Sequence, residues 1–245
     1  MTNFFQGRLY LAPIGDYPQR VLDLGTGTGI WAIEFAEQFP SAEVCGIDLS
    51  PTQPDWVPTN VKFQIDDLEG NWAWPENHFD FIHARNLEAC FRDLPKFFQQ
   101  LYKHTKPGGW FEIKEFEIQA RSQSTDLDEN HIFNRWERLV RTHVERLGKP
   151  ANNAANRRYA TGLADAGFVE IVEQKWKIPV GFWPKDLELK KVGGCNLSLF
   201  DESLEGFMLF TLRELAGHTY DETQEIINEM RTALRNKRLQ PYYYM

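Results

Sequence analysis

The residues best placed to do chemistry lie where an apolar run meets a glycine-rich turn. Residues 21–24 (VLDL) lead into Gly25-Thr26-Gly27-Thr28-Gly29, and a helical pattern begins at Ile30. Glycines permit a tight turn and let the backbone approach a ligand, while the first turn of the helix presents unpaired N–H groups. This segment predicts a cradle for a nucleotide-type ligand.

Asp23, just before the glycines, narrows the class of ligand. The spacing here is G-x-G-x-G, whereas the dinucleotide fingerprint is G-x-G-x-x-G with a pyrophosphate on the helix N-terminus. Because an acid beside the loop disfavours a pyrophosphate, a nicotinamide dehydrogenase is disfavoured too. A zwitterion fits better: Asp23 can meet an ammonium group while the backbone of Gly25, Thr26 and Gly27 meets a carboxylate, as in the methionine end of S-adenosylmethionine (SAM).

Further acids follow the next two predicted strands. Asp48 lies about twenty residues beyond the glycines, where an acid can accept both ribose hydroxyls, and Leu49 is expected against the adenine. Asp66 and Asp67 offer acceptors for the adenine amine, with Leu68 for its ring face. The alternative for this acidic pair is a solvated loop.

The first half alternates β-branched runs with helical patterns, which is typical of a parallel sheet covered by helices. We predict strands over 20–24, 43–48, 61–65, 79–83 and 110–117, and helices over 30–38 and 87–104, the second ending before the turn at 107–109. Three prolines between residues 51 and 58 exclude a crossover helix there.

The second half reads as a helix-rich cap. We predict helices over 128–147, 151–166, 187–215 and 221–235, with the third broken at Gly193-Gly194, and strands over 168–177 and 242–244. The expected organisation is a single domain over 1–245, with a cofactor-binding half at 1–120 and a cap with closing strands at 121–245.

Composition restricts the partners. The 245 residues carry a formal net charge of -8 with a pI near 5.3, which argues against nucleic acid because phosphate affinity comes from clustered Lys and Arg. No apolar run reaches the roughly 18 residues of a membrane span, and no signal peptide pattern opens the chain. The three cysteines show no metal-ligand spacing. We expect a cytoplasmic protein without a metal or a membrane partner.

Four segments together resemble one family. LDLGTGTGIWAIEFA, GIDLSPTQPDWVPTNVKFQIDD, FDFIHARNL and KPGGWFEIKE look like class I SAM-dependent methyltransferases of the fungal LaeA-like branch. The resemblance implies an α/β, Rossmann-like, doubly wound and mostly parallel seven-stranded sheet of order 3-2-1-4-5-7-6, with a helical cap inserted near the C-terminus. It also implies SAM as cofactor, S-adenosylhomocysteine as product, and His83 and Arg85 at the cofactor edge.

Methyl transfer from a sulfonium is an in-line displacement that requires no covalent residue. If the acceptor is a hydroxyl, a general base helps, and His83, His131 and Glu115 are candidates, with His83 ranked first. The alternative for His83 is a packing role at a strand end. Arg85 is expected to contact the SAM carboxylate or to pair with a nearby acid.

The resemblance leaves three functions open. The first is a small-molecule methyltransferase of fungal secondary metabolism; the second is a SAM-binding regulator that acts through protein partners, with nuclear location then expected. The third keeps the fold with a non-methylating, cyclase-type activity or one completed by a partner. Because the first predicted strand begins at Arg20, the cofactor site is expected to be more open than in relatives, or covered by a second copy or a partner. At the other end, the last sheet edge is expected to be incomplete.

Overall fold

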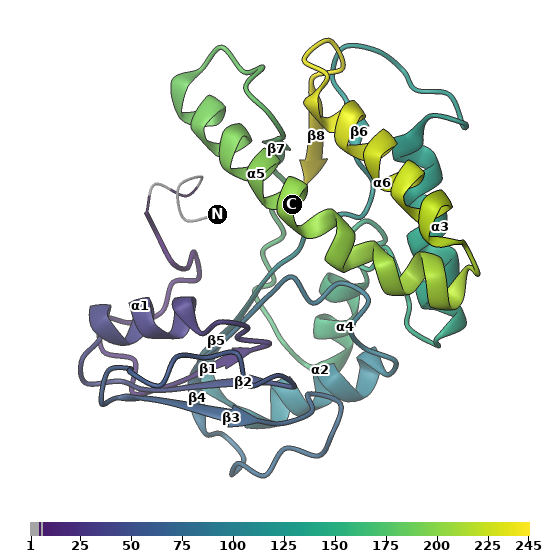
Figure 1. The fold of residues 1–245 in the computed structure, drawn as a ribbon. Coiled ribbons are helices and arrows are strands. Elements are labelled where there is room, and N and C mark those ends of the chain that lie inside the picture. The colour runs from purple at the N-terminus through teal and green to yellow at the C-terminus, as the bar shows by residue number, and fades with distance from the viewer. Residues whose placement is uncertain (1–4, 6) are drawn as a thin grey trace. The chain divides into compact units, whose positions relative to one another are not determined.

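The computed structural model describes residue 5 and residues 7–245, which form two compact units (Figure 1). The sheet unit comprises residues 8–115 and 157–173. The helical unit comprises residues 116–156 and 174–245 with residues 5 and 7. The first segment of the sheet unit ends at Glu115, and its second segment comes from the part of the chain that follows the first segment of the helical unit.

The sheet unit is built on five parallel strands in the order β3-β2-β1-β4-β5. The predicted Rossmann-like class is therefore confirmed. The order reverses between β1 and β4, so their carboxyl ends flank the crevice where open α/β sheets bind ligands. The strands are β1 (Arg20–Leu24), β2 (Glu43–Asp48), β3 (Val61–Ile65), β4 (Phe79–Arg85) and β5 (Thr105–Lys114).

Helices cover both faces of this sheet (Figure 1). The helix α1 (Ile30–Gln38) joins β1 to β2 and α2 (Leu94–His104) joins β4 to β5, in opposite directions across the sheet. Right-handed crossovers in opposite directions place the two helices on opposite faces. The helix α4 (Arg158–Ala166) packs on α2, where Gly162 leaves room for the Phe98 ring.

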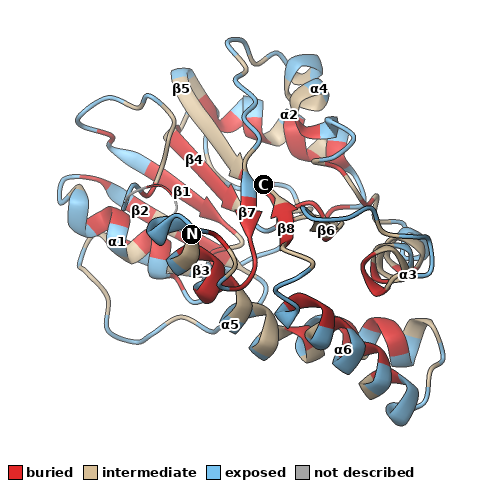
Figure 2. Ribbon diagram, turned by 90° about the horizontal axis from the view of Figure 1, so that it is seen from above, coloured by how far each residue is buried: buried red, intermediate tan, exposed pale blue. Residues whose placement is uncertain are grey.

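Side chains alternate between the two faces of the central strands. Val21 and Phe81 belong to the buried cluster around α1, so Asp23 and His83, two residues further on, face α1 as well. Leu22 and Ile82, both fully buried, face the opposite side. Buried positions accordingly run along β1 and β4 (Figure 2). A polar pair thus lies inside the sheet under α1.

Several predicted boundaries in the sheet unit were wrong, among them the end of β5, at Lys114 rather than residue 117, and the start of α4, at Arg158 rather than residue 151. The helix expected from residue 87 begins at Leu94, because Asp93 caps it by accepting from the Lys96 N–H at 2.9 Å. Before it, Asn86 and Ala89 adopt left-handed backbone conformations that a helix excludes. The turn expected at 107–109 lies inside β5, which shifts register opposite Phe79 and Phe81. The helix-free connection between β2 and β3 is confirmed.

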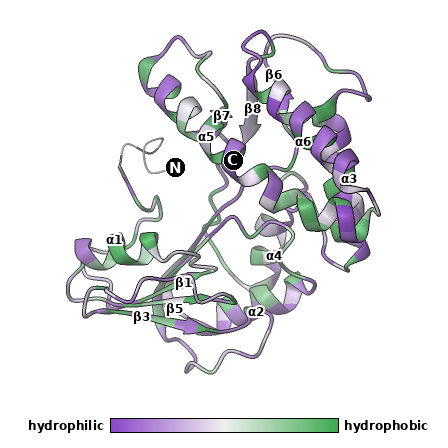
Figure 3. Cartoon of the chain, in the orientation of Figure 1, coloured by the Kyte–Doolittle hydropathy of each residue, from purple (hydrophilic) through white to green (hydrophobic). Residues whose placement is uncertain are grey.

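The helical unit combines three long helices with a small sheet of its own. The helices bury a shared apolar core that includes Phe133, Leu204 and Ile227, and polar and apolar positions alternate along them (Figure 3). None of the helices in the described residues is long and apolar enough to cross a bilayer. The elements are α3 (Ile132–Arg146), α5 (Leu187–Phe210) with a π-helical end (Thr211–Leu215), α6 (Tyr220–Arg235), β6 (Arg121–Ser122), β7 (Lys177–Pro179) and β8 (Pro241–Tyr244).

The expected single seven-stranded sheet was wrong. The closing strand β8 forms as predicted, but it pairs antiparallel with β6 and β7 in a separate three-stranded sheet. The strand predicted over 168–177 is also wrong: only Lys177 of that range lies in a strand. Val169 and Val172 are 81% and 74% exposed, so their β-branched side chains bury no face that a strand would need.

The predicted break at Gly193-Gly194 does not occur, and α5 is continuous. A Cβ on Gly193 would lie 2.1 Å from the carbonyl oxygen of Gly181. The Gly181 N–H donates to the Gly193 carbonyl at 2.7 Å. The glycines let the segment before α5 pack against the helix backbone, a gain that offsets their low helix propensity.

Two substitutions in α5 separate close packing from helix propensity. Gly193→Ala should destabilise the protein by roughly 2 kcal/mol or more, because backbone must move to admit the methyl group. Gly206→Ala, in open space of the same helix, should stabilise it by about 0.5–1 kcal/mol. Urea unfolding of both variants measures the difference, and equal effects would contradict the packing argument.

Candidate functional site

The glycine loop after β1 is held from the side of β2. Gly27 donates its N–H to Asp48 Oδ2 at 2.8 Å, and its carbonyl accepts from Thr52 Oγ1 at 3.0 Å and from Gln53 Nε2 at 2.6 Å. Thr52 and Gln53 belong to the proline-containing connection that replaces a crossover helix. This connection therefore braces the loop, a role that its sequence did not indicate.

Asp23 supports the same loop from within the sheet. Its side chain is 4% exposed, with Oδ2 accepting from Thr26 Oγ1 at 2.6 Å and Oδ1 paired with His83 Nδ1 at 2.7 Å. Both carboxylate oxygens therefore have partners inside the protein. In this geometry Asp23 joins the glycine loop to His83.

His83 is enclosed between Asp23 and Trp31. The ring is 1% exposed and stacks on the Trp31 indole with ring centroids 3.8 Å apart and planes 4° from parallel. Burial lowers the pKa of His83 from its ordinary value, although the hydrogen bond to Asp23 acts in the opposite direction. A neutral ring donating from Nδ1 leaves Nε2 as a buried acceptor, without a partner among the described residues. His83 is thus built as a support for Asp23, with no exposed nitrogen to serve as a base.

The segment before β1 is anchored to the same region. The Leu9 carbonyl accepts from Trp31 Nε1 at 3.0 Å and from Lys114 Nζ at 3.2 Å. Glu112 pairs with Lys114 and accepts from the backbone N–H groups of residues 11 and 12. Sequence analysis missed this anchor, although Glu112 and Lys114 alternate with apolar residues in a predicted strand, which should have marked them as facing one side together.

The predicted adenosine residues gather at the carboxyl ends of β2 and β3. The Asp66 N–H donates to the Asp48 carbonyl at 3.0 Å, which joins the two strand ends. Asp66 and Asp67 are exposed and Leu68 is half-buried. Leu49 and Ile65 are 69% and 65% exposed, so two apolar side chains accompany the acids. Ile65 was not singled out by the sequence.

The remaining candidates have different surroundings. Arg85 is half-buried and lies level with Lys114 in the strand register, and it joins none of the ion pairs formed within the described chain. Glu115 is 6% exposed and accepts two backbone N–H groups. Burial raises its pKa to about 8. His131 belongs to the helical unit, where its Nδ1 caps α3 by accepting from the Phe133 N–H at 3.2 Å.

Known proteins identify the family. A methyltransferase domain model matches residues 2–155. Methyltransferase pytC of Aspergillus terreus is 35% identical over 237 residues, covering 96% of this chain and 72% of that protein. This chain is a SAM-dependent methyltransferase. The methyltransferase is also 32% identical over 244 residues to the secondary metabolism regulator LAE1 of Cochliobolus heterostrophus, covering 97% of this chain and 78% of that protein.

A solved structure agrees on the fold. Phosphoethanolamine N-methyltransferase 2 of Haemonchus contortus, in complex with phosphomonomethylethanolamine and S-adenosylhomocysteine, superposes with a TM-score of 0.54 at 17% identity. The alignment covers 95% of the methyltransferase and 48% of that chain. SAM is the cofactor of the family.

The donors and surfaces of the sheet unit suit SAM. A Cβ on Gly27 would meet no atom within 4 Å, so the loop presents open backbone. Asp48 is only partly buried, and a carboxylate has lone pairs beyond those used by Gly27 and by the Ser50 N–H at 3.0 Å. An acid for the ribose diol and apolar side chains for the purine are thus both available at one edge.

The support of Asp23 by His83 can be tested through stability. His83→Leu should cost about 2–3 kcal/mol in the free energy of unfolding, because it leaves a buried carboxylate oxygen without its donor. His78→Leu is the control, since the His78 side chain is half-buried and its ring nitrogen bonds to the guanidinium of the exposed Arg20 at 2.9 Å. Chemical denaturation of both variants measures the costs, and equal costs would contradict a specific role for the pair.

Proposed function

We propose that the methyltransferase binds SAM along the carboxyl ends of β1 to β4 and transfers its methyl group to a small molecule of fungal secondary metabolism. The observation that carries the proposal is the junction of Gly27 with Asp48 at 2.8 Å. This hydrogen bond joins an open glycine loop to an acid at the end of the neighbouring strand, so one edge offers sites for both ends of the cofactor.

Each part of SAM has a residue suited to it. Asp48 would accept the ribose hydroxyls, while the exposed faces of Leu49 and Ile65 would contact the adenine. The Thr26 N–H donates to the Ile47 carbonyl at 2.9 Å and the Gly27 N–H donates to Asp48, so the methionine carboxylate would rely on Arg85, which follows His83 at the end of β4. Asp66, Asp67 and Leu68 would border the purine amine and ring.

The bound cofactor supplies an electrophilic methyl group. The protein contributes position: a loop fixed by Asp23, His83 and Trp31 holds the cofactor so that an acceptor atom can approach in line, within about 3–3.5 Å of the methyl carbon. His83 and Glu115 are both buried, so in this proposal neither removes a proton from the acceptor. His83 instead supports the loop through its hydrogen bond to Asp23.

The acceptor class rests on the relatives. The names methyltransferase pytC and secondary metabolism regulator LAE1 support a place in fungal secondary metabolism, and a net charge of -8 disfavours polyanionic acceptors. The cytoplasm is the proposed compartment. We propose no general base, and the acceptor must then be an intrinsically nucleophilic or readily ionised atom.

A second candidate is a SAM-binding regulator that acts through a protein partner, favoured by the similarity to LAE1 at 32% identity. A partner, or a second copy of the chain, would then contact the methyltransferase directly, and a nuclear location would follow. Co-purification of tagged protein from fungal lysate separates the two: a stoichiometric partner supports the regulator, and its absence at cellular concentrations opposes it.

Cofactor binding provides the first test of the site. Asp48→Asn should weaken SAM and S-adenosylhomocysteine binding by roughly tenfold or more in calorimetric titration, because an amide loses the charge that strengthens hydrogen bonds to the ribose. Asp55→Asn makes the same charge change at an exposed position of the next loop and should leave affinity unchanged. Equal affinities for the wild type and both variants would sink the assignment of Asp48.

Methyl transfer tests the reaction. Methyl-labelled SAM incubated with the protein and an extract of a metabolite-producing fungal culture should label a low-molecular-weight product, detected by chromatography. The Asp48→Asn variant at subsaturating SAM should give a correspondingly lower rate, because the substitution acts on cofactor affinity. Label found only in protein would instead favour a macromolecular acceptor.

A further inference from the structure

The turn after β4 is held by a carboxylate that no proposed step uses. Glu115, directly after β5, accepts from the Leu87 N–H at 2.7 Å through Oε1 and from the Glu88 N–H at 3.0 Å through Oε2. The side chain is buried. Two backbone donors on two oxygens of one carboxylate fix the turn against the end of the neighbouring strand.

This turn needs external support because its backbone is strained. Asn86 and Ala89 both have φ values of 59°, in the left-handed region that residues with a Cβ disfavour. Such conformations persist where the surroundings over-determine them, and they gather at functional sites. Between these two residues lie Leu87 and Glu88, whose N–H groups bond to Glu115.

Leu87 connects the turn to the glycine loop. A Cβ on Gly25 would lie 2.4 Å from Leu87 Cδ2, so the leucine side chain packs directly on the Cα of Gly25. Gly25 itself has a φ of 63°, which only glycine adopts freely. Leu87 is 7% exposed and therefore fills the space beside the loop.

We propose that Glu115 is a positioning residue for the cofactor, which acts through the turn 86–89 and Leu87 to fix Gly25 in the glycine loop. The inference rests on the proposed binding of SAM at that loop. In this proposal a residue that follows β5 contributes to cofactor binding. It does so by accepting backbone N–H groups of the turn, not by touching the cofactor.

The sheet unit contains a matched control. Asp80 also accepts two backbone N–H groups, both through Oδ2, from Gln19 at 3.0 Å and from Arg20 at 2.7 Å, while its Oδ1 pairs with Lys106 at 2.7 Å. These donors lie at the start of β1, at the amino end of the strand, whereas the glycine loop follows its carboxyl end. Asp80→Asn therefore disturbs a similar carboxylate–backbone contact at the other end of β1, away from the glycine loop.

Because Glu115 titrates, its effect on SAM affinity should depend on pH. Burial is the main cause that raises its pKa to about 8, the Glu88 carboxylate raises it further, and the two N–H donors oppose them. Glu88 in turn lies 3.5 Å from the Tyr159 hydroxyl. Below the pKa the wild-type group is a neutral acid with one strong acceptor oxygen, much like an amide; above it, the carboxylate accepts both N–H groups fully.

The experiment compares SAM affinity of the wild type, Glu115→Gln and Asp80→Asn by calorimetry at about pH 6.5 and about pH 9, on either side of the pKa of about 8. Glu115→Gln should bind SAM about tenfold more weakly than the wild type at the higher pH, the equivalent of one hydrogen bond. At the lower pH the ratio should shrink toward one. Asp80→Asn should lower the thermal midpoint and leave SAM affinity within about twofold at both pH values.

Leu87→Ala tests the path through the turn. As a single substitution, it should weaken SAM binding. The double variant with Glu115→Gln should bind SAM no more weakly than the weaker-binding single variant, because both substitutions remove the same support of Gly25. If Glu115→Gln does not fold, a loss of affinity in Leu87→Ala without a loss in Asp80→Asn supports the path, and unchanged affinity in Leu87→Ala overturns it.

Three further results would overturn the proposal: equal affinities of Glu115→Gln and the wild type at the higher pH, a ratio that is the same at both pH values, or equal losses in Glu115→Gln and Asp80→Asn. These results leave the cofactor site intact as long as the wild type binds SAM. If the wild type binds no SAM at either pH, the proposed function fails, and the role of Glu115 fails with it.

Discussion

The turn from β1 into α1 is the constraint on which the rest of the sheet unit depends. Its three glycines all have positive φ values, and such a segment has large conformational freedom in the unfolded chain. Rigidity must therefore come from outside the loop. Asp48 and the proline-containing connection hold Gly27, Thr26 bonds to Asp23, and Leu87 packs on Gly25. Each neighbouring strand end contributes one of these contacts.

The supports are polar groups buried within the sheet, which proteins tolerate only when the groups are paired. Asp23, His83 and Glu112 are opposite one another in the register of β1, β4 and β5. Trp31 stacks on the His83 ring of this row and donates to the Leu9 carbonyl. The row links the segment before the sheet to the glycine loop, so that ordering one favours ordering the other.

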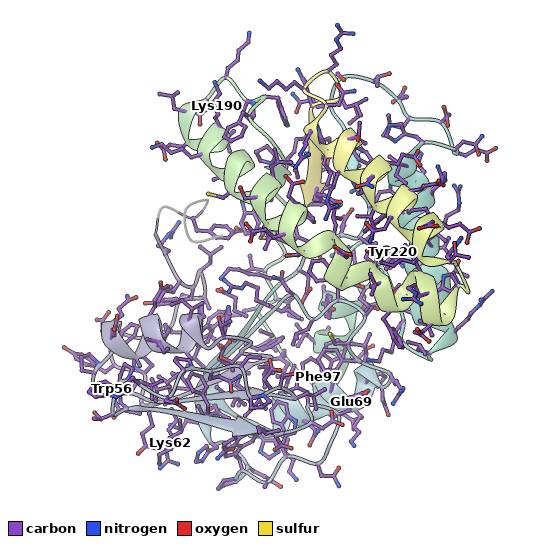
Figure 4. The ribbon with its side chains drawn as sticks, viewed as in Figure 1. Trp56, Lys62, Glu69, Phe97, Lys190 and Tyr220 are labelled. Atoms are coloured by element: carbon purple, nitrogen blue, oxygen red, sulfur yellow. The ribbon has the colours of Figure 1, made fainter. Side chains whose placement is uncertain are left out.

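Neither the family nor the fold specifies which acceptor the methyltransferase recognises. The family model matches residues 2–155, which span the sheet unit and part of the helical unit, and the helical unit has a separate small sheet and its own core. Exposed aromatic and apolar side chains occur in both units, among them Trp56 at 94% and Phe207 at 65% (Figure 4 labels Trp56). Fold and cofactor are shared across a family, whereas acceptor recognition depends on such individual surfaces.

The sequence by itself determined the strands β1 to β3, the helix α1 and the helix-free connection after β2, because these depend on local periodicity, glycine and proline. It also indicated the cofactor, through the resemblance of its motifs to those of a known family. Tertiary structure alone decided which strands β8 pairs with, the continuity of α5 through Gly193, and the burial of His83. It also brought Glu115 to the turn that covers Gly25. These features join residues far apart in the chain, and strand pairing and close packing are set by which surfaces meet, which no local pattern encodes.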